Sequence, residues 1–202
     1  MSNSDGSDQT VPMRGCLIVI SGPSGAGKTS ICKALLEGLP NTVWSVSVTT
    51  RPPRPGEVKG HSYQFVSRQE FEAKQAAGEL LESAEYIGHR YGTPRQPVEE
   101  ALAAGRNVVM EIDVQGGMQV AEKMPKSVRI FVLPPNMESL RARLEGRRTE
   151  AAEQLAKRLA EADGEIAIAR DSGSYSHFVV NDVLETTVEQ VKRIIEEERR
   201  QA

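Results

Sequence analysis

Hydrophobic residues gather along the chain in short runs that predict buried strands. The runs lie at residues 16–20, 108–112, 128–133 and 178–180. Residues 28–37 predict a helix that ends at Gly38, and Thr186 with Glu189 has capping-box spacing at the start of a last helix. Continuous apolar runs are typical of strands that are buried on both faces. Strands alternating with helix-like sequence therefore predict an α/β fold around a parallel sheet.

Two segments depart from this alternation. Between residues 44 and 92 the sequence favours short strands around one helix, whose start is marked by Ser67 and Glu70 at capping-box spacing. This pattern indicates an inserted subdomain with its own small sheet. Residues 136–170 form a charged helical stretch, which by itself is typical of a solvated helical hairpin.

Composition narrows the function classes. The chain has 202 residues, enough for one buried core, and 25 basic against 28 acidic side chains argue against nucleic acid as a partner. No apolar run approaches the roughly 20 residues that span a bilayer, so no membrane association is expected. Residues 1–12 lack the features of a signal peptide and are expected to form a disordered tail. Without a CxxC pair, Cys16 and Cys32 are expected to be buried thiols in a reducing cytoplasm.

A glycine-rich segment follows the first predicted strand and has the spacing of a phosphate-binding loop. The predicted ATP-binding residues in it are Gly22, Pro23, Ser24, Gly25, Ala26, Gly27, Lys28, Thr29 and Ser30. Glycines let backbone N–H groups surround phosphate oxygens, and a helix N-terminus adds positive charge. Lys28 is expected to reach the β- and γ-phosphates, while the Thr29 hydroxyl binds Mg²⁺ directly or through water. The alternative, a turn without a ligand, fits the strand and helix context less well.

The inserted segment carries the chemistry for a second phosphate. Arg51 and Arg54 lie on a proline-stiffened turn, from which two guanidinium groups could grip a phosphate with little loss of entropy. Tyr63 and Tyr91 could add hydroxyl donors. Alone, such a segment would be an exposed proline-rich loop, but beside a phosphate-binding loop it predicts an acceptor site. The chain lacks the Asn-Lys-x-Asp segment with which GTPases usually bind guanine.

After its first residues the whole sequence resembles the guanylate kinase family of P-loop nucleoside monophosphate kinases. The segments that carry the resemblance are 45–57, 63–67, 79–82, 91–93, 111–116, 143–147 and 180–182. The resemblance implies Mg²⁺-dependent transfer of the γ-phosphoryl group of ATP to GMP, giving ADP and GDP. It implies a P-loop core at 13–46, 97–135 and 171–202, a GMP-binding subdomain at 47–96 and a helical lid at 136–170.

The resemblance also assigns the base-binding residues. Glu82 is implied as the acceptor for the N1–H and N2–H₂ donors of guanine, and Ser47 and Thr93 as partners on the O6 side. Asp113 is implied at the base or the Mg²⁺, although its position equally suits a helix N-cap. The implied GMP-binding residues are Ser47, Arg51, Arg54, Tyr63, Glu82, Tyr91, Thr93 and Asp113, and the implied metal-binding residues are Thr29 and Asp113.

The resemblance assigns catalysis to positively charged residues, because phosphoryl transfer spreads negative charge over the transferring group. The implied catalytic residues are Lys28, Arg51, Arg143, Arg147 and Arg158, and Asn181 is implied at the adenine. The family usually has aspartate at the position of Glu111. A kinase for another monophosphate would need no carboxylate such as Glu82, and a non-catalytic interaction module would typically have a degraded phosphate-binding loop.

Overall fold

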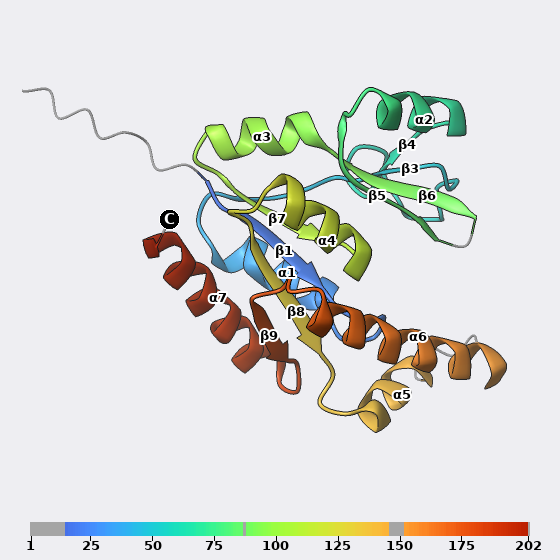
Figure 1. Cartoon of the computed structure of the whole chain (residues 1–202), viewed down its shortest axis with the longest axis vertical. Coiled ribbons are helices and arrows are strands. Elements are labelled where there is room, and N and C mark those ends of the chain that lie inside the picture. The colour runs from blue at the N-terminus through green and yellow to red at the C-terminus, as the bar shows by residue number, and fades with distance from the viewer. Residues whose placement is uncertain (1–14, 87, 146–151, 202) are drawn as a thin grey trace, which may run out of the picture.

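The computed structural model describes residues 15–86, 88–145 and 152–201 (Figure 1). The larger sheet has five parallel strands in the order β2-β7-β1-β8-β9. These strands are β1 (Leu17–Ser21), β2 (Thr42–Trp44), β7 (Asn107–Glu111), β8 (Val128–Leu133) and β9 (His177–Val180). The predicted α/β fold around a parallel sheet is confirmed.

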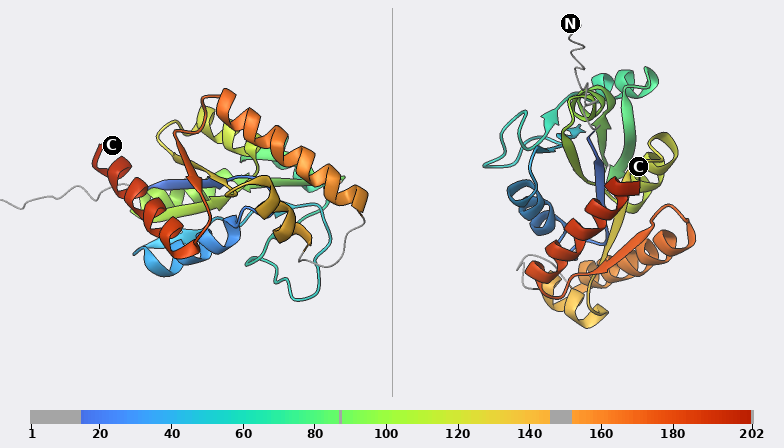
Figure 2. Two further views of the ribbon diagram at one scale, coloured as in Figure 1. Left: turned by 90° about the horizontal axis from the view of Figure 1, so that it is seen from below. Right: turned by 90° about the vertical axis from the view of Figure 1, so that its left-hand side faces the viewer.

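Helices cover both faces of this sheet, as Figure 2 shows. They are α1 (Lys28–Gly38), α3 (Arg95–Ala103), α4 (Val114–Lys123) and α7 (Leu184–Gln201). Alternate residues of β1 point to opposite faces: Ile18 and Ile20 pack with α1 and α7, whereas Leu17 and Val19 pack with α3 and α4. Each such side chain stabilises the fold by roughly 1.5–3 kcal/mol when fully buried.

The segment predicted as an insertion forms a second sheet, which lies beside the core sheet in Figure 1. Its strands run in the order β4-β3-β6-β5 and are β3 (Val48–Thr49), β4 (Gln64–Phe65), β5 (Leu80–Tyr86) and β6 (His89–Pro94). Helix α2 (Arg68–Ala76) buries Phe71 against Val48 and Leu80, which gives this sheet a small core of its own. The Ser67 hydroxyl accepts from the Glu70 backbone N–H at 3.1 Å, and the Glu70 carboxylate accepts from the Ser67 N–H at 2.7 Å. The predicted capping box is confirmed.

Two further helices follow β8, namely α5 (Met137–Glu145) and α6 (Ala152–Asp171). Leu140 and Leu144 of α5 pack against Ala162 of α6. Within the described part of the charged stretch, residues 137–145 and 152–170 therefore belong to two helices that pack against each other. Figure 1 shows this pair at the end of the molecule opposite the C-terminus.

Two details of the predicted elements are wrong. The sequence pattern places Trp44 at the start of the inserted segment, but Trp44 belongs to β2 of the core sheet, where it pairs with Val109. The first strand of the small sheet is β3, which consists of Val48 and Thr49. Helix α7 begins at Leu184, so Thr186 lies inside the helix and does not cap it. Leu184 packs against the core, and this burial extends the helix beyond the start that its polar residues suggested.

The expectation that both cysteines are buried is met in part. Both cysteines are free thiols; Cys32 is buried as predicted, whereas Cys16 is only partly buried, and burial raises its thiol pKa to about 11. Across residues 15–86, 88–145 and 152–201, no helix combines the length and the apolar character needed to cross a bilayer.

Candidate active site

One cleft of about 800 Å³ brings together the phosphate-binding loop, the small sheet and α6. The predicted site residues that line it are Gly22, Ser24, Lys28, Thr29, Ser47, Arg51, Arg54, Tyr63, Glu82, Tyr91, Asp113 and Arg158. Residues separated by more than a hundred positions in sequence thus share one cavity. The carboxyl ends of the core strands open into it, as expected for an open parallel sheet.

The loop between β1 and α1 has the backbone of a phosphate cradle. Gly22, Gly25 and Gly27 have φ angles of 144°, 88° and 94°, which side chains on L-residues strongly disfavour. The loop closes through hydrogen bonds from Ala26 N to Pro23 O and from Ser30 N to Gly27 O, both 3.1 Å long. These bonds leave the loop pre-shaped before any phosphate is bound.

Lys28 lies across the mouth of this loop. Its Nζ donates to the carbonyl oxygens of Gly22 at 2.6 Å and Pro23 at 3.0 Å. Burial lowers the pKa of Lys28, and the carboxylate of Glu111 opposes that shift. A phosphate oxygen would replace backbone carbonyls as the partner of this ammonium group.

Asn181 supports the loop from behind. Its side-chain amide donates to the carbonyl oxygen of Ala26 at 2.7 Å, and a Cβ at Gly27 would collide with the same amide nitrogen. Arg143 donates to the backbone carbonyl of Asn181 at 2.9 Å. Arg143 and Asn181 are thus placed together beside the loop, outside the lining of the cleft.

A hydroxyl and a carboxylate meet on the other side of the loop. Thr29 Oγ1 donates to Glu111 Oε1 at 2.9 Å, and Glu111 ends strand β7. Asp113, two residues later, caps α4 by accepting from Gly116 N at 2.7 Å, which is the N-cap alternative, and it also lines the cleft. Hard oxygen donors in this arrangement suit Mg²⁺, which usually takes one or two protein ligands and completes its shell with phosphate and water.

Glu82 is a buried carboxylate in the cleft, with only 3% of its surface exposed. The Thr93 hydroxyl donates to Glu82 Oε1 at 2.6 Å, and burial raises the pKa of Glu82 to about 7. The register of the β5–β6 pair shifts between Leu80 and Glu82. Such an irregularity changes the direction in which nearby side chains point. Gly116 leaves space for the carboxylate, since a Cβ there would lie 2.9 Å from Glu82 Oε2.

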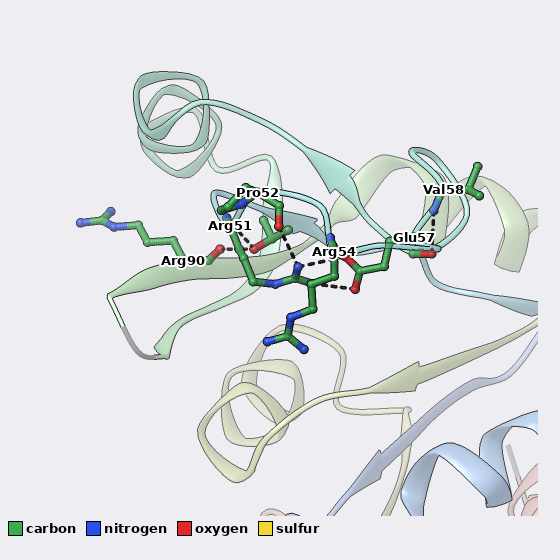
Figure 3. Close-up of polar contacts among 8 residues, drawn as sticks. Arg51, Pro52, Arg54, Glu57, Val58 and Arg90 are labelled. Atoms are coloured by element: carbon green, nitrogen blue, oxygen red, sulfur yellow. Dashed lines mark hydrogen bonds and ion pairs between the residues drawn. The ribbon is translucent and has the colours of Figure 1, made fainter. Parts of the chain in front are cut away.

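Arg51 is almost completely buried, at 8% exposure, whereas Arg54 is exposed. The Arg51 guanidinium lies 5.4 Å from the ring centroid of Tyr63, and the rings of Tyr63 and Tyr91 are 6.0 Å apart. Arg51 also forms an ion pair with Glu57, drawn in Figure 3. The predicted arginine and tyrosine cluster is therefore assembled on one side of the cleft.

Helix α6 adds charged groups from the opposite side. Arg158 donates to the Ser24 hydroxyl at 2.5 Å, which joins α6 to the phosphate-binding loop. Glu165, two turns further along, also lines the cleft, and burial raises its pKa to about 7. Arg147 lies outside the described residues.

Four carboxylates in the cleft were not predicted as site residues: Glu57, Glu111, Glu161 and Glu165. A signal existed for two of them. Glu57 is the first acidic residue after the arginine turn, and Glu111 ends an apolar strand beside Asp113. For Glu165 the only signal is its position seven residues after Arg158, which places both on one face of a helix.

The sequence matches the family model described as guanylate kinase over residues 14–198. It is 49% identical to the guanylate kinase of Symbiobacterium thermophilum, over 92% of this chain and 87% of that protein. It is also 49% identical to the guanylate kinase of Lactococcus lactis, over 92% of this chain and 89% of the relative. The chain belongs to the guanylate kinase family. The resemblance seen in the sequence is thereby confirmed.

The fold agrees with a solved guanylate kinase. The crystal structure of guanylate kinase from Anaplasma phagocytophilum superposes with a TM-score of 0.74 at 36% sequence identity, covering 93% of this chain and 87% of that one. The α/β core with an inserted small sheet and a helical pair is therefore the architecture of a guanylate kinase.

Proposed function

We propose that this guanylate kinase transfers the γ-phosphoryl group of ATP to GMP in the cleft, giving ADP and GDP. One observation carries the proposal: an intact phosphate-binding loop and the buried carboxylate of Glu82 line the same cavity. The first suits a nucleoside triphosphate and the second suits a guanine base. A cavity of about 800 Å³ is within the range of small-molecule sites.

On the acceptor side, the Glu82 carboxylate would accept from guanine N1–H and N2–H₂, with Ser47 and Thr93 near the O6 side. Adenine has no donor at N1, so it would leave the buried carboxylate unpaired. A site built around such a hydrogen bond can reject the wrong ligand by roughly 10⁴-fold. The cluster of Arg51, Arg54, Tyr63 and Tyr91 would bind the phosphate of GMP.

On the donor side, the backbone of Gly22–Ser30 would bind the phosphates of ATP, with Lys28 at the β- and γ-phosphates. Asn181 and Arg143 lie on the side of the loop where we expect the adenine. Thr29 and Glu111 would hold Mg²⁺, with Asp113 reaching it through water or contacting the base. The metal would supply charge neutralisation between the β- and γ-phosphates.

Transfer needs positive charge around the moving group, and an arginine supplied by the same chain can contribute roughly 10³-fold or more in rate. Lys28, Arg51 and Arg158 are within the cleft lining, and we assign them this role together with Arg143 and Arg147. No general base is required, because the acceptor phosphate is already anionic. We also retain the three predicted parts: core at 13–46, 97–135 and 171–202, acceptor subdomain at 47–96, and lid at 136–170.

The site of action that we propose is the cytoplasm, where the free thiols of Cys16 and Cys32 would stay reduced.

The deciding experiment is a coupled ADP-release assay with ATP–Mg²⁺ and GMP, AMP, UMP, CMP or dTMP as acceptor. We expect turnover with GMP to exceed the others by roughly 10³-fold or more. A different preferred acceptor would overturn the role of Glu82. No turnover with any acceptor would favour a non-catalytic interaction module.

A further inference from the structure

The Glu57 carboxylate binds Arg51 through two parallel hydrogen bonds. Nη1 of Arg51 donates to Glu57 Oε2 at 2.9 Å, and Nη2 donates to Oε1 at 2.8 Å. The same Oε2 accepts from the backbone N–H of Arg54 at 2.7 Å. Figure 3 shows that the Arg54 side chain extends away from this carboxylate. Glu57 thus joins the side chain of Arg51 to the backbone of Arg54 and stabilises the turn at residues 51–57.

The remaining donors of Arg51 can be counted. A guanidinium group has five N–H bonds in a fixed plane. Nη1 uses both of its hydrogens, one on Glu57 and one on the carbonyl oxygen of Pro52 at 2.8 Å, and Nη2 uses one. The other Nη2 hydrogen and Nε–H lie along the second edge of the plane. Nε is buried and has no hydrogen-bond partner among the described residues.

The orientation of the plane is also held. Arg51 lies over the rings of Tyr63 and Phe65, at 5.4 and 5.9 Å from their centroids. Its hydrogen bonds to Glu57 raise the pKa of Arg51, so the group stays charged. Stacked rings and an ion pair together leave the guanidinium little rotational freedom.

We propose that Glu57 is a positioning residue for the acceptor: it holds one edge of Arg51 so that the Nε–Nη2 edge faces the phosphate of GMP. The inference rests on the proposed acceptor site, in which Arg51 binds that phosphate. A guanidinium held in its binding orientation pays less entropy when the ligand arrives. The buried, unpartnered Nε is the donor that the phosphate would satisfy.

The opposite role for the same carboxylate is competition, in which Glu57 takes the place of the phosphate and must leave before GMP binds. The hydrogen-bond count favours positioning, because Glu57 occupies only the Nη1–Nη2 edge. In its third hydrogen bond Glu57 accepts from the Arg54 backbone N–H, and this bond stabilises the turn itself. The two roles predict changes of opposite sign when the carboxylate is removed.

The test is Glu57→Gln, measured by steady-state kinetics and by calorimetric binding of GMP and of guanosine, which lacks the phosphate. A glutamine keeps the size but loses the charge and one acceptor. We expect KM and Kd for GMP to rise about 10-fold, with KM for ATP and Kd for guanosine unchanged. A lower KM for GMP would establish competition, and an equal loss for guanosine would reduce Glu57 to a structural role; either overturns the inference.

Three further variants make the result specific. Glu72→Gln removes a Glu–Arg ion pair on helix α2, outside the lining of the cleft and 3.1 Å long to Arg68, and should leave KM unchanged. Glu57→Asp keeps the charge but shortens the reach, so a smaller rise in KM for GMP is expected; it also provides the readout if the glutamine variant does not fold.

Arg51→Ala separates this inference from the proposed site. In that background Glu57→Gln should change the GMP affinity no further, because its effect acts through Arg51. If Arg51→Ala weakens GMP binding but Glu57→Gln does not, only the role of Glu57 fails. If Arg51→Ala leaves GMP binding intact, the proposed acceptor site fails and the inference with it.

Discussion

The two sides of the cleft are built in different ways. On the donor side, one segment of consecutive residues, Gly22–Ser30, supplies a closed backbone loop with Lys28 across it. On the acceptor side, Arg51, Glu82 and Thr93 come from separate strands and turns of the small sheet. Backbone N–H groups suit any phosphate, whereas a particular base needs particular side chains. The donor site is therefore local in sequence and the acceptor site is assembled by folding.

The donor and acceptor sides of the cleft also differ in their electrostatics. Lys28 is a partly buried cation whose neighbours include Glu111, and Glu82 is a buried carboxyl group whose pKa is raised by burial to about 7. The donor site is ready to receive negative charge, while the acceptor site holds a carboxylate at a cost in stability until a ligand donates to it.

The largest expected effect comes from Lys28→Ala, which removes the only cation that the donor loop itself contributes. Turnover should fall by about 10³-fold or more, because charge on the transferring group loses its partner, while the Kd for GMP should stay within about two-fold. Turnover is measured by ADP release and Kd by calorimetry. Lys126→Ala, at an exposed lysine outside the lining of the cleft, is the control. Equal loss of turnover and of GMP binding would mean that the two sides are not separate.

Next in size is Phe71→Ala, which empties the core of the small sheet. Phe71 is fully buried against Val48 and Leu80, so the variant should lose about 3–5 kcal/mol of folding free energy. Hydrogen exchange should increase in β3 to β6 more than in the core sheet, and KM for GMP should rise more than KM for ATP. Phe71→Leu is the milder control. Uniform exchange across both sheets would show that they unfold as one unit.

Glu82→Gln tests recognition on the acceptor side. We expect the kcat/KM for GMP to fall by roughly 10²–10³-fold, because an amide cannot accept from both guanine donors as a carboxylate does. The KM for ATP should not change. Thr93→Val, which removes only the neighbouring hydroxyl, should cost less. A variant that keeps its GMP preference would show that the base is recognised elsewhere.

The same residue predicts a pH dependence of stability without ligand. Because its pKa is raised to about 7 in the fold, protonated Glu82 contributes stability below pH 4.5, and this contribution is lost as pH rises through about 7. Relative to the wild type, Glu82→Gln should therefore gain up to about 3 kcal/mol between pH 4.5 and 8. Urea unfolding at both pH values measures it. A constant difference would contradict the burial of the carboxylate as its cause.

The smallest effect is expected from Ser67→Ala, which removes the cap of α2 and should cost about 1 kcal/mol in chemical unfolding. Thr186→Ala is the matched comparison, since Thr186 has the same sequence spacing but lies exposed inside α7. Alanine there should be neutral or slightly stabilising. A comparable loss in both variants would mean that Thr186 acts as a cap after all.

Much of the fold could be predicted because it depends on local pattern. The apolar runs of β1, β7, β8 and β9 and the glycine-rich loop predicted the parallel sheet and the phosphate cradle. The start of α7 and the sheet to which Trp44 belongs could not be predicted from local pattern, because packing against the core decided both. Asp113 remained open between cap and ligand, and the structure shows the cap at 2.7 Å without excluding its place in the cleft.

The sequence by itself determined the donor loop, the family and the residue types of the acceptor site, since these follow from consecutive residues. Only the tertiary structure decided that Arg158 donates to Ser24, that Thr29 pairs with Glu111 and that Glu165 lies near Lys28 in the cleft. The reason is physical: backbone conformation depends on near neighbours, whereas the partner of a charged side chain depends on which distant strands and helices pack together.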